Sequence, residues 1–364
     1  MTQPLAQHIL TYALTLDGGG VERVQLRLAR EWVARGRRVT LIVGCDAGPL
    51  ADEIADGVEC IRIDTRNYAM LVAKVPGLVA RLRPDTIFCP GNRYTAVAGW
   101  TRARLGRACP PTLGKLSNAL DRIDMIAPMR AAYALWLRMH PAFLDRLVAM
   151  SPAMATDAAW RMAMPERRLA VIENPPPRRG AGAVGVDLPP RYLLGVGRLV
   201  PQKRWDRAIA ALARLADSTI PLVLLGEGPD RAKLVRCAET LGIADRLILA
   251  GHVPDPMPAM AGAAAVVLTS DYEGVPGVVR EALSVGAPVV TTDSTPAVYE
   301  LIPDTRHGTI VGRDDADALV AAIDQRIGAG GERPTPVAVT GDPAGDYLSL
   351  FDSLVASRPS SSPS

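Results

Sequence analysis

Short apolar runs alternate along this chain with segments whose apolar residues recur at helical spacing. Residues 8–16 form such a run, and Val21, Val24, Leu28 and Trp32 follow at the spacing of a helix face. This rhythm predicts parallel strands joined by helical, right-handed crossovers. The further strands predicted in the first half are 38–43, 58–63, 85–89, 112–117, 147–150 and 169–173, and the helices are 68–82, 125–139 and 153–164.

A stretch rich in proline and glycine divides the chain. Residues 174–190 read NPPPRRGAGAVGVDLPP, which cannot hold a regular helix or strand. Beyond this predicted linker the rhythm resumes, with strands expected at 192–197, 222–225, 247–250, 265–268 and 307–311 and helices at 203–215, 230–241, 257–262 and 316–327. The 364 residues are enough for two doubly wound α/β domains, at 1–177 and 178–340. A short helix within 341–357 and a disordered tail at 358–364 would complete the chain.

The stretch 269–290, TSDYEGVPGVVREALSVGAPVV, suggests chemistry most directly. It is interpreted as a strand end, a polar turn, a helix and another strand. Glu273 in the turn and Glu281 in the helix can both face the carboxyl ends of the strands, where open α/β sheets bind ligands. Backbone N–H groups of residues 274–278 lie near the helix start and suit an anion. Carboxylates for hydroxyl groups beside amides for phosphate suggest a nucleotide sugar.

Two cations follow the first strand of the second half. Arg198 and Lys203 lie in the sequence GRLVPQK, between that strand and the next predicted helix. A guanidinium can bridge two phosphate oxygens and an ammonium adds a point charge, so the pair could stabilise a departing diphosphate. Ordinary surface charge is the alternative. The turns LLGEGP and GH, which contain Glu227 and His252, follow two further strands and could form walls of a nucleotide pocket.

The turn DGGGVE at 17–22 follows the first strand of the chain. It is not GxGxxG, and no acidic residue ends the second strand where a ribose would bind, so we do not expect a dinucleotide cofactor. Glycines at a strand-to-helix turn allow a ligand to approach the backbone closely. A plain tight turn is the alternative.

Charge and cysteine usage narrow the function classes further. Residues 1–177 carry 23 Lys and Arg against 16 Asp and Glu (23 − 16 = +7), and residues 178–364 carry 18 against 22 (18 − 22 = −4). A basic half suits an anionic partner, although too few aromatic residues accompany the arginines to stack nucleic-acid bases.

The 5 cysteines form no CxxC pair and are interpreted as reduced core thiols of a cytosolic protein. Without a charged leader or a long apolar run, any membrane contact would be peripheral.

Taken together, the motifs GGVE, GRL with Lys203, LLGEGP, GH and the EGVPGVVREALSVGAPVV stretch resemble glycosyltransferase family 4, the group 1 retaining enzymes of the GT-B fold. The resemblance covers nearly the whole chain and is most specific in its second half. It implies two Rossmann-like domains facing across a cleft, an acceptor-binding domain at 1–177 and a nucleotide-sugar-binding domain at 178–340. It also implies that the helix within 341–357 crosses back onto the first domain.

The resemblance assigns roles residue by residue. Arg198 and Lys203 would hold the diphosphate, Glu281 the ribose hydroxyls, and Glu273 the donor sugar. We expect Arg198, Lys203 and Glu273 to carry the chemistry. The remaining residues expected at the donor are Gly19, Gly20, Gly197, Glu227, Gly228, His252, Gly274, Val275 and Pro276.

The acceptor side departs from the family pattern. Many members have a histidine after a central strand of the first domain, where this chain has Pro90-Gly91-Asn92-Arg93. The polar residues expected near the acceptor are Asn92, Arg93, Lys115, Ser117 and Asn118, and the sequence does not decide among them.

The expected reaction is transfer of a sugar from a UDP or GDP sugar to a hydroxyl group, with retention of configuration. The acceptor is expected to be a saccharide or a lipid-linked saccharide of cell-envelope polysaccharide or lipopolysaccharide synthesis. No DxD motif lies in a suitable loop, so no metal or other cofactor is expected. A nucleotide-sugar epimerase and a non-catalytic, nucleotide-sugar-binding subunit of a polysaccharide assembly remain alternatives, because a fold does not fix its chemistry.

Residues 122–146 interleave arginines with apolar residues, and their net charge is +2, from four Arg less Asp124 and Asp145. A basic amphipathic helix with a tryptophan suits a membrane interface. Ordinary core packing is the alternative. With the basic first half, this segment favours an acceptor at the membrane and a protein on the cytoplasmic face of the plasma membrane.

Overall fold

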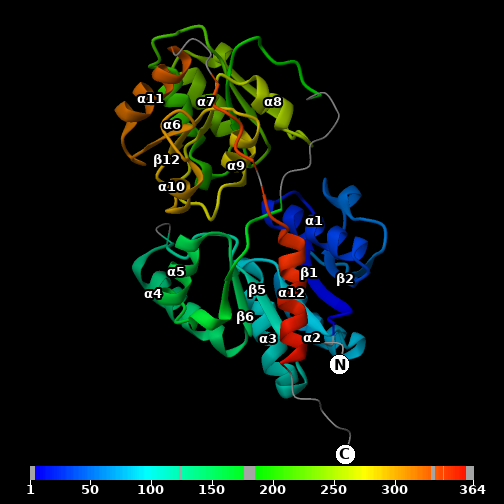
Figure 1. Ribbon diagram of the computed structural model, residues 1–364. Helices are drawn as coiled ribbons and strands as arrows, with labels where there is room; N and C mark the ends of the chain where they lie inside the picture. Colours follow the sequence, from blue (N-terminus) through cyan, green and yellow to red (C-terminus); the bar gives the residue numbers. More distant parts are fainter. Residues whose placement is uncertain (1–4, 123–124, 176–184, 329–332, 339, 358–364) are drawn as a thin grey trace, which may run out of the picture. The chain divides into compact units, whose positions relative to one another are not determined.

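The computed structural model describes residues 5–122, 125–175, 185–328, 333–338 and 340–357 (Figure 1). It divides into an N-terminal unit, Met1–Pro175 with Gly341–Ser364, and a C-terminal unit, Pro176–Thr340. Most of the predicted linker at 174–190, namely residues 176–184, and the predicted tail at 358–364 lie outside the described residues.

The N-terminal unit is built on a parallel sheet in the order β3-β2-β1-β4-β5-β6-β7. Its strands are β1 (His8–Thr15), β2 (Arg38–Cys45), β3 (Val58–Arg62), β4 (Thr86–Cys89), β5 (Thr112–Lys115), β6 (Arg146–Ala149) and β7 (Leu169–Val171). The chain runs outward from β1 to β3 and then returns to the centre to form β4. The direction of strand addition therefore reverses between β1 and β4, which confirms a doubly wound domain.

The helices of this unit are α1 (Gly20–Ala34), α2 (Tyr68–Leu82), α3 (Thr95–Leu105), α4 (Ala127–Met139), α5 (Pro152–Arg161) and α12 (Pro343–Ala356). The bounds of α2 are those predicted. The pattern did not predict α3, because its sequence TAVAGWTRARL gives no single apolar face. Helix α12 begins at Pro343, inside the predicted range 341–357, since the Asp342 side chain caps it by accepting from the Gly345 amide at 3.1 Å, and Pro343 occupies its first turn.

Helix α12 packs against the sheet and α1 of the N-terminal unit, although it is the last helix of the chain (Figure 1). Phe351 meets the Trp32 ring edge-on at 5.1 Å between centroids, and Tyr347 meets Phe88 at 5.4 Å. All four rings are fully buried. The Trp32 indole N–H donates to the Ala344 carbonyl, so apolar burial and a hydrogen bond both hold α12 against the N-terminal unit.

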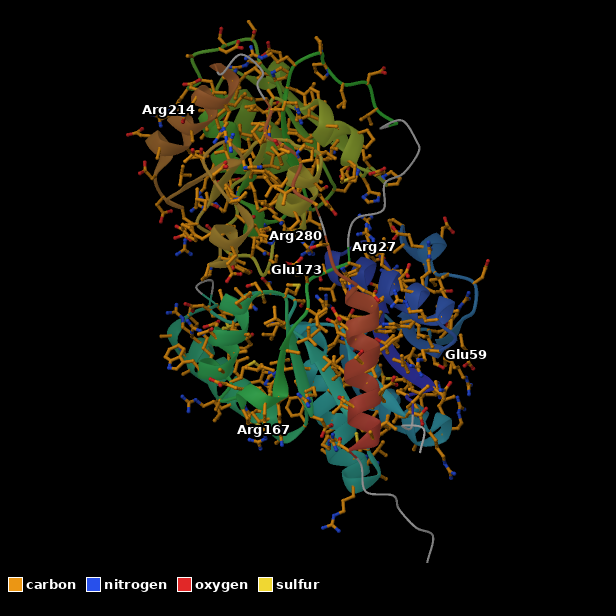
Figure 2. The ribbon with its side chains drawn as sticks, viewed as in Figure 1. Arg27, Glu59, Arg167, Glu173, Arg214 and Arg280 are labelled. Atoms are coloured by element: carbon orange, nitrogen blue, oxygen red, sulfur yellow. The ribbon has the colours of Figure 1, made fainter. Side chains whose placement is uncertain are left out.

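Strand β3 is the edge of this sheet and carries polar side chains. Glu59, labelled in Figure 2, accepts from Arg38 Nη2 at 2.9 Å and from Thr40 Oγ1 at 3.0 Å. Charged side chains on an exposed edge discourage pairing with another sheet. Cys60 on this strand is exposed, so the interpretation of every cysteine as a core thiol is wrong at this position, whereas Cys89 and Cys109 are buried.

The C-terminal unit contains a second parallel sheet, in the order β10-β9-β8-β11-β12-β13. Its strands are β8 (Leu193–Val196), β9 (Leu222–Leu225), β10 (Leu247–Gly251), β11 (Ala265–Leu268), β12 (Val289–Thr292) and β13 (Gly308–Val311). Its helices are α6 (Trp205–Leu212), α7 (Arg231–Thr240), α8 (Met257–Gly262), α9 (Gly277–Ser284), α10 (Ala297–Leu301) and α11 (Ala316–Gly328). Strand addition reverses between β8 and β11, so this domain too is doubly wound.

One predicted helix of this unit has a later start. The expected helix at 203–215 begins at Trp205, because Arg204 adopts a left-handed backbone conformation with φ of 48°. Lys203 instead ends a 3-10 turn, Pro201–Lys203. The turn places Lys203 beside the carboxyl end of the sheet.

Candidate functional site

The loops after β8 and β11 lie at the switch point of the C-terminal sheet, because these two strands are neighbours although far apart in sequence. The β8 loop carries Arg198 and Lys203, and the β11 loop carries Ser270 and Glu273. Diverging crossovers leave room for a ligand at such a point. Residues that the sequence analysis took from two separate motifs therefore meet at one edge.

Lys203 and Glu273 form an ion pair at the centre of this edge. The Nζ–Oε1 distance is 2.5 Å, and the Ser270 hydroxyl donates to the same oxygen at 2.6 Å. Glu273 is 8% exposed. Both donors use Oε1, so within the described residues Oε2 has no partner. One oxygen of this buried carboxylate is fixed by the protein, and the other can accept hydrogen bonds from a ligand.

Side chains that the sequence analysis missed fasten the two loops together. Gln202 Nε2 donates to the Tyr272 carbonyl at 2.7 Å, and the Thr269 hydroxyl donates to the Arg204 carbonyl at 2.8 Å. Asp271 accepts from Arg207 Nη1 at 2.6 Å. Gln202, Thr269 and Asp271 stand inside the quoted motifs, but a motif does not reveal which of its polar residues position the others.

Arg198 differs from its neighbours because its side chain is exposed. Within the part of the chain that the structure describes, no hydrogen bond or ion pair engages its guanidinium. Its carbonyl accepts from the Trp205 indole at 3.1 Å, which fixes its backbone. The guanidinium is therefore available to an anion without breaking an internal ion pair.

The loops after β8 and β9 approach each other closely through their backbones. Gly226 has φ of 150°, and a Cβ built on it would lie 1.9 Å from the Gly197 carbonyl oxygen. A Cβ on Gly228 would lie 2.2 Å from the Leu199 oxygen. The GEG motif needs its glycines because the backbone of the β8 loop occupies the space that their side chains would fill. Glu227 between them pairs with Arg231 at 2.8 Å, and His252 on the next loop is exposed.

The start of α9 presents backbone donors beside Glu273. The helix begins at Gly277, with Pro276 as its N-cap residue. Among the described residues, no backbone carbonyl outside the helix accepts from the amides of Gly274, Val275, Gly277 and Val278. Unused amides at a helix start, together with the dipole, favour a negative charge. Glu281, in the same helix, is half-buried.

In the N-terminal unit, the expected donor-side glycines lie at the other switch point, between β1 and β4. Gly19 is the N-cap residue of α1, and Gly20 is its first residue. Glu22 in the first turn accepts from the Tyr94 hydroxyl at 2.8 Å, and that hydroxyl accepts from the Leu14 amide at 3.1 Å. This Glu22–Tyr94 contact, which the sequence did not reveal, fixes the glycine turn.

Three of the residues expected near the acceptor form one cluster. Asn92 Oδ1 accepts from the Ser117 amide at 2.8 Å, and Asn92 Nδ2 donates to the Asn118 carbonyl at 3.2 Å. Arg93 does not join them, because its guanidinium lies 6.0 Å over the Tyr68 ring of α2. Lys115, at the end of β5, is buried, a property that its position in the sequence did not indicate.

No group of three or more His, Cys, Asp or Glu side chains that could hold a metal ion occurs in residues 5–122, 125–175, 185–328, 333–338 or 340–357. The positive charge at the C-terminal site comes from Arg198 and Lys203. A search of the same residues finds no helix with the length and apolar character needed to cross a membrane.

Comparisons with known proteins agree on one family. Residues 19–175 match the family model described as glycosyl transferase 4-like domain, and residues 182–332 match glycosyl transferases group 1. The chain is 31% identical over 373 aligned positions to the 2-deoxystreptamine N-acetyl-D-glucosaminyltransferase of Streptomyces fradiae, covering 90% of this chain and 87% of that protein. It is 28% identical to the lipopolysaccharide core biosynthesis glycosyltransferase LpsE of Rhizobium meliloti, covering 85% and 86%.

Solved structures show the same fold at lower identity. The Anabaena protein HepE in complex with UDP-glucose has a TM-score of 0.69 and 19% identity, over 96% of this chain and 95% of that one. The lipopolysaccharide outer core galactosyltransferase WaaB has a TM-score of 0.64 and 18% identity, over 96% and 94%. The expectations of fold and family are confirmed. The chain belongs to the group 1, or family 4, glycosyltransferases and has their two-domain, Rossmann-like GT-B fold.

Proposed function

We propose that this glycosyltransferase moves a hexosyl group from a UDP or GDP sugar to an acceptor hydroxyl with retention of anomeric configuration. The observation that carries the proposal is the Lys203–Glu273 pair at the switch point, together with the Arg198 guanidinium and the amides at the start of α9, which the described residues leave without partners. Cations and amides suit the diphosphate, and the spare Glu273 oxygen suits hydroxyl groups of the sugar. The HepE complex with UDP-glucose supports a donor of this class.

In this proposal each element holds one part of the donor. Arg198 and Lys203 bind the diphosphate, Glu273 and the amides after it bind the sugar, and Glu281 binds the ribose. Gly197, Glu227, Gly228 and His252 lie on the loops that would enclose the nucleotide.

The proposed chemistry takes place on one face of the sugar. The acceptor oxygen bonds to the anomeric carbon as the bond between that carbon and the diphosphate oxygen breaks, and the acceptor proton passes to the departing phosphate. Negative charge grows on the leaving diphosphate, so fixed cations stabilise the transition state more than the ground state. With this charge supplied by side chains and helix amides, we propose that the reaction needs no metal ion.

A thermal-shift screen of UDP, GDP, ADP and their sugars tests the donor class. One uridine or guanosine ligand is expected to raise the melting temperature, because a ligand of the native state stabilises it by mass action. Arg198→Met should weaken that ligand roughly 10-fold or more, since a hydrogen bond to a charged group contributes about 1.5–3 kcal/mol. Its melting temperature without ligand should not change, because no described residue bonds to the Arg198 guanidinium.

The matched control is Arg236→Met, an exposed arginine of α7. It should leave the affinity unchanged. Equal affinities of the wild type and Arg198→Met would contradict the donor site. Adding EDTA to a turnover assay tests the proposal that the reaction needs no metal ion. The proposal is wrong if activity disappears and only a divalent ion restores it.

We further propose an acceptor at a membrane surface in cell-envelope saccharide synthesis, and the relative LpsE is named as a lipopolysaccharide core biosynthesis glycosyltransferase. Helix α4 supports this placement because Leu137 is its one buried residue. Ile126, Met129, Leu135 and Met139, in or beside it, are exposed, Leu135 by 66%. The core-packing alternative does not account for these side chains. Exposed arginines on the same helix, Arg130 and Arg138, would favour the anionic cytoplasmic leaflet.

Co-sedimentation with anionic lipid vesicles tests the membrane contact. The wild type is expected to sediment with phosphatidylglycerol vesicles, and Leu135→Gln with Met139→Gln should bind at least roughly 10-fold more weakly, because each buried apolar side chain contributes about 1.5–3 kcal/mol. Leu241→Gln, at an exposed leucine of the C-terminal unit, is the control. Equal binding of the α4 variant and the wild type would rule out α4 as the contact.

A further inference from the structure

Lys115 is a buried ammonium group of the N-terminal unit. It ends β5, is 4% exposed, and lies one strand away from the switch point. Its Nζ donates to the Met150 sulfur at 3.1 Å. Among the residues that the structure describes, no carboxylate lies within ion-pair distance, and a thioether is a weak acceptor for a charged donor.

Lys115 also lines a small pocket. The pocket encloses about 10 Å³, room for one water-sized group, and has about 270 Å³ of empty space when its open mouth is counted. Asn92 and Thr95 line it together with Tyr133 and Trp136 of α4, and none of its lining residues is acidic. The enclosed part can admit an oxygen of a carboxylate or phosphate, while a sugar ring would have to remain in the mouth.

Several other polar groups that line the pocket already bond inside the protein. Asn92 bonds to the Ser117 amide and the Asn118 carbonyl, and the Thr95 hydroxyl donates to the Asn92 carbonyl at 3.0 Å. The His140 ring bonds through Nδ1 to the Trp136 and Leu137 carbonyls. Lys115 therefore supplies the ammonium donors of this pocket.

Burying an ammonium group beside a single weak acceptor is costly. The cost appears as a pKa of Lys115 lowered to about 7 by burial. A buried charged group without an ion-pair partner is unfavourable for folding, and such unfavourable features are expected at functional positions. The position fits a binding role, because the pocket shares Asn92 with the proposed acceptor cluster and adjoins the exposed helix α4.

We propose that the Lys115 pocket binds an anionic group of the acceptor, a carboxylate of an acidic sugar or a phosphate. That the bound anion belongs to the acceptor rests on the proposed function, whereas the binding of an anion in this pocket does not depend on it. A carboxylate or phosphate oxygen entering the pocket would form the ion pair that the protein does not provide. An acceptor carrying several ammonium groups would be repelled.

The test measures melting temperatures with two probes, sodium glucuronate and inorganic phosphate, at constant ionic strength and with excess UDP to occupy the donor site. The neutral sugar glucose is the probe control. Wild-type protein should melt roughly 3 °C higher at a concentration ten times the dissociation constant of a bound probe. Lys115→Met, which keeps the length of the side chain, should show no shift. Lys74→Met, at an exposed lysine of α2, should respond like the wild type.

Lys115→Met is expected to fold and to melt higher than the wild type without ligand, because it removes an uncompensated buried charge. A response to glucuronate alone would identify a sugar carboxylate, and a response to phosphate alone would identify a phosphate-bearing acceptor. The proposal is overturned if neither anion shifts the wild type, or if Lys115→Met shifts equally. A response to UDP in both proteins, measured separately, reports the donor site and keeps its outcome distinct from that of the pocket.

Discussion

Replacing Lys203 with alanine is expected to lower kcat by roughly 10²- to 10³-fold, the loss typical of removing one preorganised donor to a developing negative charge. The KM for the donor should rise less, since the charge on the diphosphate grows as the bond breaks. Steady-state kinetics with the donor identified by the thermal-shift screen measures both constants. Lys233→Ala, at an exposed lysine of α7, is the matched control and should retain full activity.

The same variant should also lose stability, because Glu273 would keep a buried charge without its partner. Removing one member of a buried ion pair costs about 3–5 kcal/mol. Lys203→Ala with Glu273→Gln should recover much of that stability and remain inactive. Recovered activity in the double variant would mean that Lys203 only neutralises Glu273 and does not act on the diphosphate.

Replacing Phe351 with alanine is expected to destabilise the N-terminal unit by about 3–5 kcal/mol. The ring is fully buried, 5.1 Å from Trp32 and 6.2 Å from Phe88. Its removal leaves a cavity between α12 and the sheet that neighbouring aromatic rings cannot easily fill. Scanning calorimetry in the presence of the bound nucleotide measures the effect, because the ligand should separate the melting of the two units.

Ser349→Ala, at an exposed position of α12, is the matched control and should change stability by less than about 0.5 kcal/mol. The transition of the C-terminal unit should stay where it is in both variants. A Phe351→Ala protein as stable as the wild type would show that α12 contributes little to the N-terminal core. The helix would then depend mainly on polar contacts such as the ion pair of Arg37 Nη2 and Asp352 Oδ2, which are 2.9 Å apart.

Much of the fold could be predicted because apolar periodicity is a local property. The bounds of α2, β9 and β11 agree with those read from the sequence. Helix α3 could not be predicted, since its stability depends on the burial of Thr95, Val97, Ala98 and Thr101 against the rest of the unit. The start of α6 depends on the left-handed backbone conformation of Arg204, and the pattern of hydrophobic residues does not show backbone conformation.

The candidate site could be predicted as a set of residues but not as an arrangement. Arg198 and Lys203 look equivalent in sequence, whereas the structure gives Lys203 an internal carboxylate and leaves Arg198 unpaired among the described residues. The sequence does not distinguish Asn92, Arg93 and Ser117 as candidates for the acceptor site. In the structure Asn92 bonds to Ser117, whereas the Arg93 guanidinium lies over the Tyr68 ring. The motif identifies a loop, and packing decides which atoms of the loop are free.

The sequence by itself determined two doubly wound domains, the strand ends that carry chemistry, and a family whose members transfer sugars. Each of these depends on periodicity or on short motifs, which a chain carries locally. Only the tertiary structure decided that β8 and β11 are neighbours and that Lys203 therefore meets Glu273 across 70 residues. It also decided that Lys115 is buried, with no carboxylate of the described residues at ion-pair distance. Ion pairing and desolvation depend on groups brought together from distant parts of the chain, so no local pattern encodes them.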